Sequence, residues 1–371
     1  MTKKVLVFGM TENPGGVESV IMNYYRNIDL KRVHFDFLCN SYEPIAYEDE
    51  LTSNGSKCFH FVARSKNPIK YHKELKTFFK KHADEYSAIW VNVCSLANID
   101  YLKLAKKYGI SKRIIHSHNS ENMDSKLRGK LHEYNKKRLW KYATDFWACS
   151  EEAAKWFYDK KLLKKVVIIK NAIDINRVSF DEKKRQHYRE KINAKDRFVI
   201  GNVGRLHFQK NQSFLIDIFN DYLKEDPTTI CILIGDGEDK HKLINKVKQY
   251  GIEDRVLFLG VQSDVQGWLS AMDLFLFPSL FEGLPVAPLE AQGNGVPVLA
   301  SEGIMPYELK INDNFLFFSL KKSSKEWADE ISTIKEKLPR LSVDKTRENF
   351  SDCGYNIKAE AKKMEKKFLI Q

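Results

Sequence analysis

The 371-residue sequence lacks the paired cysteines that build zinc sites or disulfide frameworks. Its six cysteines are scattered without a CxxC pair, so we expect them to be reduced residues of the core. No apolar run reaches the roughly 18 residues that a membrane-spanning helix requires. The amino terminus is basic and then apolar for only about six residues before Glu12 and Pro14. This pattern predicts a buried first strand rather than a signal peptide.

Proline is also scarce, with 10 residues, and 43% of the chain is hydrophobic, which excludes long disordered or collagen-like tracts. A chain of this length is expected to form two domains. The formal charge is +12 and unevenly spread, because residues 1–195 hold 38 basic and 23 acidic side chains. A basic half of this kind fits nucleic acid, an anionic membrane or a phosphorylated substrate, and equally a lysine-rich surface that only aids solubility.

Short apolar runs alternate with amphipathic stretches along the whole chain, which is typical of parallel sheets covered by helices. The predicted strands of the first half are at 5–8, 34–39, 58–62, 88–93, 113–117, 145–149 and 166–169. After a charged stretch, a second series runs through 198–203, 229–234, 256–259, 274–277, 297–300 and 315–318. We therefore predict an α/β protein with two Rossmann-like, doubly wound domains that face a central cleft. Their expected bounds are 1–190 and 191–350, with a last helix at 351–371 that crosses back to the first domain.

The most informative segment is 277–298, where a predicted strand ends in a turn and a helix follows. In a doubly wound sheet this junction lies at the carboxyl edge, where ligands bind. The backbone N–H groups of Gly283 and Leu284 at the helix start suit a phosphate. The carboxylates of Glu282 and Glu290 suit the paired hydroxyls of a sugar. The alternative is that both glutamates are ordinary helix residues, with Glu282 interacting only with the helix dipole.

A second candidate site follows the first strand of the second half. Gly204 permits a close backbone approach, and Arg205 and Lys210 stand five residues apart on a loop that leads into a helix. Two cations in this arrangement can hold a diphosphate. Without further context they are equally an exposed basic loop.

Three other segments carry weaker signals. The first strand-to-helix turn is rich in glycine but lacks GxGxxG spacing, so a plain tight turn stays open. His116 and His118 point the same way if their strand continues, and with no acidic or cysteine ligand nearby a single substrate-binding imidazole is favoured over a metal pair. Asp236 and Glu238 follow a strand as metal-binding carboxylates do in some sugar transferases, and we interpret them as residues of a helix start.

Together these segments resemble glycosyltransferase family four, the retaining sugar-nucleotide transferases of the GT-B fold, over nearly the whole chain. The resemblance rests on the order of its motifs: Gly-Gly-Val-Glu-Ser at 15–19, His-Ser-His-Asn at 116–119, Asn-Ala-Ile-Asp at 171–174, Gly204 and Arg205 with Lys210, Leu-Ile-Gly-Asp-Gly-Glu at 233–238, and Glu282 and Glu290. Capsule and exopolysaccharide enzymes look most similar. The chain departs from the pattern at Ala172, where glycine is usual, and at Pro288, which can displace the first turn of the glutamate helix.

The resemblance implies that Arg205 and Lys210 bind the donor diphosphate and that Glu290 binds its ribose. It also implies that Glu282 holds the donor sugar. The other implied donor contacts are Gly283 and Leu284 at the sugar phosphate, Val261 and Gln262 at the base, Gly16 at the donor phosphate, and His118 near the reacting carbon. We expect the catalytic group to be His118, Glu282, Arg205 and Lys210, without a metal or other cofactor. The expected donor is a nucleoside diphosphate hexose or N-acetylhexosamine, with a uridine diphosphate sugar favoured.

The stretch 124–142 interleaves cations with apolar residues, as in a helix that lies on an anionic membrane. The residues predicted for this surface are Lys126, Arg128, Lys130, Lys136, Lys137, Arg138 and Trp140. In the enzymes that this chain resembles, the region lies on the acceptor side. We therefore expect a saccharide acceptor, linked to lipid, and a cytoplasmic enzyme at the inner face of the cell membrane. An ordinary solvated basic helix is the alternative.

Other classes of protein fit the sequence less well. A GT-B epimerase or phosphorylase would not be expected to share this order of motifs. A nucleic-acid-binding protein would need more than charge, and no zinc-finger spacing or aromatic RNA-binding strand is present. A catalytically inactive, transferase-like binding subunit is harder to exclude, although it would not need to retain both cations and both glutamates.

Overall fold

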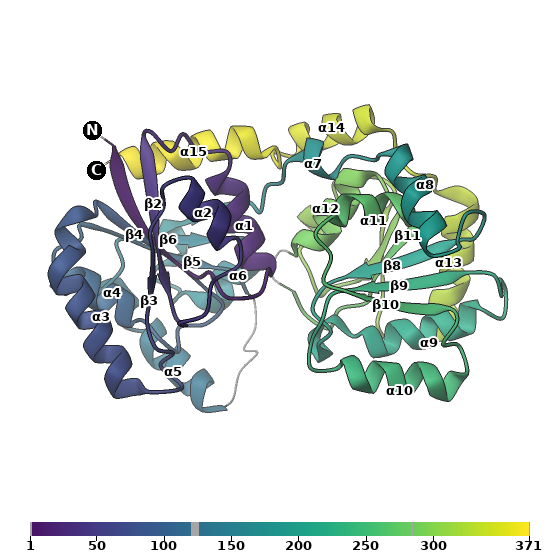
Figure 1. Cartoon of the computed structure of the whole chain (residues 1–371), viewed down its shortest axis with the longest axis horizontal. Coiled ribbons are helices and arrows are strands. Elements are labelled where there is room, and N and C mark those ends of the chain that lie inside the picture. Colours follow the sequence, from purple (N-terminus) through teal and green to yellow (C-terminus); the bar gives the residue numbers. More distant parts are fainter. Residues whose placement is uncertain (1, 120–125, 283–284, 371) are drawn as a thin grey trace. The chain divides into compact units, whose positions relative to one another are not determined.

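The computed structural model describes residues 2–119, 126–282 and 285–370. The chain divides into two compact units: an N-terminal unit of Met1–Ala172 and Ile357–Gln371, and a C-terminal unit of Ile173–Asn356. Each unit is built on a parallel β-sheet with helices packed against it (Figure 1). The prediction of two Rossmann-like α/β domains is therefore confirmed.

The N-terminal unit has, in its described part, a seven-stranded sheet in the order β3-β2-β1-β4-β5-β6-β7. Its strands are β1 (Lys3–Phe8), β2 (Val33–Cys39), β3 (Cys58–His60), β4 (Ala88–Val93), β5 (Lys112–Ser117), β6 (Asp145–Ala148) and β7 (Val166–Ile168). Its helices are α1 (Gly16–Tyr25), α2 (Glu48–Ser53), α3 (Pro68–His82), α4 (Asp100–Lys107), α5 (Lys126–Lys136), α6 (Glu151–Phe157) and α15 (Ile357–Leu369). The strand order reverses between β1 and β4, and ligands of doubly wound sheets bind at such a switch point.

Aromatic side chains fix the two faces of this sheet. On one face, the ring of Phe368 in α15 lies 5.6 Å from Phe35, 5.8 Å from Trp90 and 5.6 Å from Trp147. On the other face, Phe8 stacks on Tyr101 of α4 at 3.9 Å. Because both faces are covered, the strands read as nearly continuous apolar runs rather than as an alternating pattern.

The C-terminal unit has a six-stranded sheet in the order β10-β9-β8-β11-β12-β13, counted over the residues that the structure describes. Its strands are β8 (Val199–Val203), β9 (Ile230–Ile234), β10 (Val256–Gly260), β11 (Leu274–Phe277), β12 (Val298–Ser301) and β13 (Phe315–Phe318). Its helices are α7 (Ile175–Val178), α8 (Glu182–Lys191), α9 (Gln212–Tyr222), α10 (Lys240–Tyr250), α11 (Val265–Ala271), α12 (Val286–Asn294), α13 (Ser324–Lys337) and α14 (Val343–Asp352). Here the switch point lies between β8 and β11.

The division into units differs from the predicted bounds. Helix α8, which the prediction 1–190 places in the first domain, lies in the C-terminal unit, where Arg189 Nη1 donates to Asp273 at 2.9 Å. The physical reason is that α8 is almost entirely polar, so its sequence carries no apolar stripe that assigns it to a core. At the other end of the chain, α14 stays with the C-terminal unit, and α15 belongs to the N-terminal unit.

The cysteines only partly follow the prediction. None of the six described cysteines takes part in a disulfide bond, and Cys39, Cys149 and Cys231 are buried. Cys94 and Cys353 are exposed, so the prediction that all six are core residues is wrong for these two. Both follow the end of a secondary-structure element, β4 and α14 respectively, where the chain turns toward solvent. Over the described ranges, no helix is long and apolar enough to cross a bilayer.

Candidate functional site

The loops after β8 and β11 are tied together at the switch point of the C-terminal sheet. Leu280 donates its N–H to the carbonyl of Gln209 at 2.8 Å, and the Asn211 amide donates to the carbonyl of Pro278 at 3.1 Å. Asn211 adopts the left-handed backbone conformation, with φ at 54°, where the short turn Phe208–Lys210 passes into α9. These contacts bring two sequence-predicted segments, 70 residues apart, to one edge of the sheet.

Lys210 and Glu282 meet at this edge. The Lys210 ammonium donates to Glu282 Oε1 at 2.7 Å, and the two side chains are 18% and 6% exposed. Gln209 Nε2 donates to Glu282 Oε2 at 3.4 Å, and the ammonium also lies 4.9 Å from the centre of the Phe277 ring. A charge pair with so little exposure needs such contacts to offset its desolvation. The arrangement presents one cation and one carboxylate side by side, as a diphosphate and an adjoining sugar would require.

Arg205 lies on the same loop but is far more exposed. Its guanidinium pairs with Glu238, with Nη2–Oε2 at 3.0 Å, and the side chains are 67% and 51% exposed. His207 Nε2 lies 3.3 Å from the other oxygen of Glu238. The backbone N–H of Glu238 itself, with Arg205 and His207 beside it, holds the pKa of this carboxyl below its usual range. An exposed guanidinium held by an exposed carboxylate can exchange that partner for a phosphate at small cost.

Two glycines allow the strands to approach at this edge. A Cβ on Gly235, whose φ is +130°, would lie 2.0 Å from the carbonyl oxygen of Gly204. A Cβ on Gly237 would lie 2.3 Å from the carbonyl oxygen of Leu206. The glycine-rich stretch after β9 is thus required for packing against the Arg205 loop. Asp236 and Glu238 precede α10, whose N-cap is Asp239, and no group of three possible metal ligands occurs in the described parts of the chain.

Glu290 lies on α12, one turn beyond its start. Burial raises the pKa of Glu290 to about 7, while Arg177 of α7 acts in the opposite direction. Pro288 is buried in the first turn of α12, where a missing N–H removes no helical hydrogen bond, and α12 begins at Val286. Pro288 therefore does not interrupt α12, and Glu290 lies on this helix as predicted. Gly283 and Leu284 lie outside the described residues.

The loop after β10 holds the two residues predicted beside the base. Val261 is 62% exposed. The Gln262 amide donates to the carbonyl of Leu259 at 2.5 Å and accepts from Trp268 Nε1 at 3.0 Å. Because both polar atoms of its amide form hydrogen bonds within the protein, Gln262 stabilises the conformation of this loop. Val261 is the residue that exposes an apolar side chain there.

In the N-terminal unit, Gly16 and His118 follow strands at the carboxyl edge of the sheet, Gly16 as the first residue of α1 and His118 directly after β5. Gly16 opens α1, is exposed, and has no described atom within 4 Å of the place a Cβ would take. His118 Nε2 forms a 2.9 Å hydrogen bond with Asn92 Oδ1, and burial lowers the pKa of His118 to about 3. The His118 ring lies 4.1 Å from that of His116, which is fully buried. The two imidazoles do face the same way, without a carboxylate or thiolate beside them among the described residues.

The first strand-to-helix turn is held by Glu18, which the sequence reasoning did not single out. Its buried carboxylate accepts from Thr11 N and Gly15 N at 3.0 and 3.1 Å, and from the Thr11 hydroxyl at 2.6 Å. The sequence also did not predict that Glu238 contacts Arg205 or that Asn92 contacts His118. For Glu18 a signal existed, because a glutamate three residues after a glycine N-cap is a helix-start pattern. The partner of Arg205 lies on the loop after β9 and the partner of His118 lies on β4, so no local pattern reveals them.

The predicted membrane-facing stretch forms α5 and the short turn Leu139–Lys141. Its inward face is polar: His132 Nδ1 accepts from Leu96 N at 3.1 Å, and Asn135 donates to the Leu96 carbonyl at 2.7 Å. Its outward face carries Leu127, 68% exposed, and Trp140, 60% exposed. Of the seven residues predicted for this surface, Lys136 is partly buried and the other six are exposed: Lys126, Arg128, Lys130, Lys137, Arg138 and Trp140.

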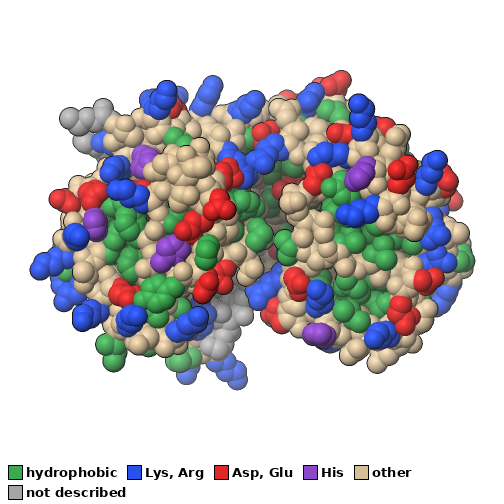
Figure 2. All heavy atoms as spheres, in the orientation of Figure 1, with side chains coloured by type: hydrophobic (Ala, Val, Ile, Leu, Met, Phe, Trp, Pro, Cys, Tyr) green, Lys and Arg blue, Asp and Glu red, His purple; other side chains and the backbone are tan. Residues whose placement is uncertain are grey.

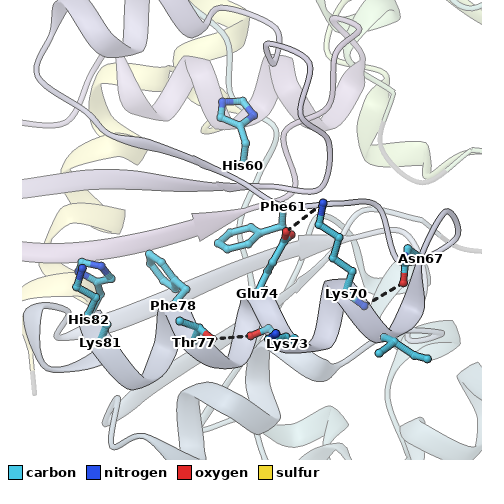
Figure 3. Close-up of a pocket in the computed structure, with 11 residues that line it drawn as sticks. His60, Phe61, Asn67, Lys70, Lys73, Glu74, Thr77, Phe78, Lys81 and His82 are labelled. Carbon is cyan, nitrogen blue, oxygen red and sulfur yellow. Dashed lines mark hydrogen bonds and ion pairs between the residues drawn. The ribbon is translucent and has the colours of Figure 1, made fainter.

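A groove of about 870 Å³ also runs along α3 in the N-terminal unit (Figure 3). Lys70, Lys73 and Lys81 line it, together with Glu74, which lies 3.7 Å from the Lys70 ammonium. None of the predicted site residues lines this groove. Across the molecule, Lys and Arg side chains are interspersed with Asp and Glu rather than gathered in one patch on the face that Figure 2 shows.

Two Rossmann-like units, with cations and carboxylates gathered at the switch point of one of them, agree with the GT-B fold that the sequence predicts. The family model described as "Glycosyl transferases group 1" matches residues 184–356, nearly the whole C-terminal unit. The putative glycosyltransferase EpsF of Bacillus subtilis is 29% identical over 367 residues, covering 92% of this chain and 93% of that protein. The uncharacterized glycosyltransferase MJ1059 of Methanocaldococcus jannaschii is 30% identical over 303 residues, 75% of this chain and 74% of that one. The chain belongs to the group 1 glycosyltransferases.

Two further proteins are similar to this chain, one in part of its sequence and one in its fold. UDP-Gal:alpha-D-GlcNAc-diphosphoundecaprenol alpha-1,3-galactosyltransferase of Escherichia coli is 34% identical over 142 residues, 37% of this chain and 36% of that protein. The crystal structure of Anabaena HepE in complex with UDP and glucose superposes with a TM-score of 0.74 at 19% identity, covering 98% of this chain and 95% of that one. The GT-B fold expected from the sequence is thereby confirmed.

Proposed function

We propose that this glycosyltransferase moves a hexose or N-acetylhexosamine from a uridine diphosphate sugar to a lipid-linked saccharide in the synthesis of a cell-surface polysaccharide. The observation that carries the proposal is the pair of Lys210 and Glu282 at 2.7 Å, with Arg205 on the same loop. Relatives named above support the donor class, since one is a UDP-galactose transferase and one is solved with UDP and glucose.

In the proposed reaction, the bond between the anomeric carbon and the diphosphate oxygen breaks as the acceptor oxygen bonds to the same face of that carbon. The acceptor hydroxyl passes its proton to the departing diphosphate, on which negative charge develops as its bond to the sugar breaks. Arg205 and Lys210 stabilise that charge, and such preorganised donors are typically worth about 10²–10³ in rate each. Glu282 orients the sugar, Glu290 accepts from the ribose hydroxyls, and no metal is required in this scheme.

The acceptor is proposed from the outward face of α5. This helix points polar side chains inward and Leu127 outward, and the short turn Leu139–Lys141 that follows it exposes Trp140. Exposed apolar side chains among cations are the composition of an interfacial helix. We infer a cytoplasmic enzyme that binds the anionic inner leaflet, where a diphosphate-linked lipid acceptor would be presented. The E. coli relative acts, by its name, on a diphosphoundecaprenol-linked sugar.

A thermal-stability screen against nucleotide sugars tests the donor. A ligand at about 100 times its dissociation constant stabilises the folded protein by about 2.7 kcal/mol, so a UDP-sugar should raise the melting temperature. Stabilisation by a guanosine donor alone would overturn the assignment. Release of an epimerised free sugar without acceptor would instead favour a GT-B epimerase, and binding without turnover for any acceptor would favour an inactive binding subunit.

A further inference from the structure

One amide side chain at the carboxyl edge of the N-terminal sheet joins two strands to a histidine that follows a third. Asn92 of β4 is buried, its Nδ2 donates to the carbonyl oxygen of Phe8 in β1 at 3.2 Å, and its Oδ1 lies 2.9 Å from His118 Nε2, directly after β5. This edge is the switch point between β1 and β4. The link therefore stands where a ligand of this sheet is expected.

The direction of each hydrogen bond follows from what its atoms can do. A backbone carbonyl only accepts, so the Asn92 amide nitrogen must face Phe8. The amide oxygen then faces His118, and because an amide oxygen also only accepts, His118 Nε2 must carry a proton. A neutral imidazole has one N–H, so Nδ1 is left as an acceptor.

The surroundings keep this arrangement fixed and neutral. Gly9, with φ at +132°, lies so close that a Cβ there would be 2.6 Å from Asn92 Cβ, which holds the end of β1 against Asn92. Burial lowers the pKa of His118 to about 3. The titratable ring in contact with it is His116, whose own pKa is also lowered by burial and which has no hydrogen-bond partner among the described residues. No described residue hydrogen-bonds to His118 Nδ1.

We propose that Asn92 is a positioning residue that fixes His118 as the neutral Nε2–H tautomer, so that Nδ1 accepts a hydrogen bond from a sugar hydroxyl. His118 then neither supplies a positive charge to the phosphate nor donates a proton to the leaving group. It selects a substrate that presents a hydrogen-bond donor, such as a hydroxyl, at that position. The sugar partner rests on the proposed function, whereas the tautomer does not.

The test is a two-bond ¹H–¹⁵N spectrum of the full chain labelled with ¹⁵N-histidine, without substrate. The signal of His118 is assigned as the one that disappears from the spectrum of the variant His118→Gln. The expected wild-type signal at pH 7 is a protonated Nε2 and an unprotonated Nδ1. An Nδ1–H tautomer or an imidazolium at pH 7 overturns the proposal, and this measurement needs no variant of Asn92 to fold.

Asn92→Leu removes the acceptor, so we expect its His118 signal to shift toward a mixture of tautomers. Asn23→Leu is the matched control, because Asn23 also donates to one backbone carbonyl, that of Ala172 at 3.2 Å, without touching His118. An unchanged His118 signal in Asn92→Leu counts against the proposal. Once a donor is known, Asn92→Leu should lower turnover about 10²-fold, as misplaced groups do. With a donor that lacks the hydroxyl facing His118 Nδ1, wild type and Asn92→Leu should have similar turnover. Because the spectrum is recorded without substrate, failure of transfer would overturn the proposed function alone.

Discussion

Lys210 donates to Glu282 at 2.7 Å across the switch point of the C-terminal sheet, although the two residues lie 72 positions apart. The Glu282 side chain is 6% exposed, and the contact with Lys210 helps to offset the desolvation of its carboxylate. The same ammonium is the group proposed to receive the donor diphosphate. The contact between Lys210 and Glu282 therefore serves both folding and the proposed reaction, and a variant of either residue should change both the stability and the turnover.

For Lys210→Ala we expect a loss of about 3 kcal/mol in the free energy of unfolding, because a buried carboxylate loses its cation. Turnover should fall about 10²–10³-fold. The double variant Lys210→Ala/Glu282→Gln should regain much of the stability and none of the turnover. Urea unfolding and transfer rates measure the two effects, and near-normal turnover in Lys210→Ala would remove Lys210 from the site.

Arg205→Ala should separate activity from stability. Because the Arg205–Glu238 pair is exposed, we expect the free energy of unfolding to change by less than about 1 kcal/mol. Turnover should still fall about 10²-fold or more. Lys224→Ala is a matched control, since Lys224 is 69% exposed and pairs with Asp221 at 2.6 Å in the same unit. Equal turnover in the two variants would contradict the role of Arg205.

The binding of a UDP-sugar should depend on the ionisation of Glu290. Burial raises the pKa of this carboxyl to about 7, so Glu290 is mostly protonated at pH 6 and mostly ionised at pH 8. Only the carboxylate accepts from both ribose hydroxyls. We expect UDP-glucose, whose phosphates do not titrate in this range, to bind up to about tenfold more tightly at pH 8.

Calorimetric titrations at both pH values measure this change, with Glu290→Gln as the control. The variant should bind more weakly at pH 8 and should lose the pH dependence. An equal pH dependence in Glu290→Gln would show that another group is responsible.

Acid should destabilise the N-terminal unit through its buried histidines. Burial lowers the pKa of His118 to about 3 and of His132 to about 4, and that of His116 well below its usual range. Below about pH 6.5 these histidines bind protons in the unfolded chain but stay neutral in the folded protein. The free energy of unfolding therefore falls as pH falls. We expect a loss of about 1 kcal/mol or more per pH unit between pH 6 and 5. Urea unfolding across this range checks it, and a flat profile would contradict the burial of these rings as neutral imidazoles.

Vesicle co-sedimentation tests the outward face of α5 and of the turn Leu139–Lys141 that follows it. The wild-type protein should bind vesicles with anionic lipid and not neutral ones. Leu127→Ser/Trp140→Ser should weaken this binding strongly, because the apolar anchors are lost. Lys248→Glu, an exposed charge reversal on α10 in the other unit, should leave binding unchanged. Equal binding to neutral and anionic vesicles would contradict the proposed surface.

The strands could be predicted from the sequence because buried parallel strands are short apolar runs, as in Ile-Cys-Ile-Leu-Ile of β9. The place of Arg205, Lys210 and Glu282 at one sheet edge followed from the same alternation. Helix α8 was assigned to the wrong side of the boundary because its polar sequence gives no periodicity. The partners Glu238 and Asn92 could not be predicted, since Glu238 lies on the loop after β9 and Asn92 lies on β4, each distant in sequence from its site residue.

The most direct test of the central claim is transfer itself. Labelled UDP-hexoses are incubated with diphosphoundecaprenol-linked saccharides in anionic vesicles, and the glycolipid product is identified by mass and by the configuration at its new anomeric carbon. The account predicts one added hexose with the donor's configuration retained, and product lowered about 10²-fold or more in Arg205→Ala. An inverted product, or equal product from Arg205→Ala and Lys224→Ala, would contradict it.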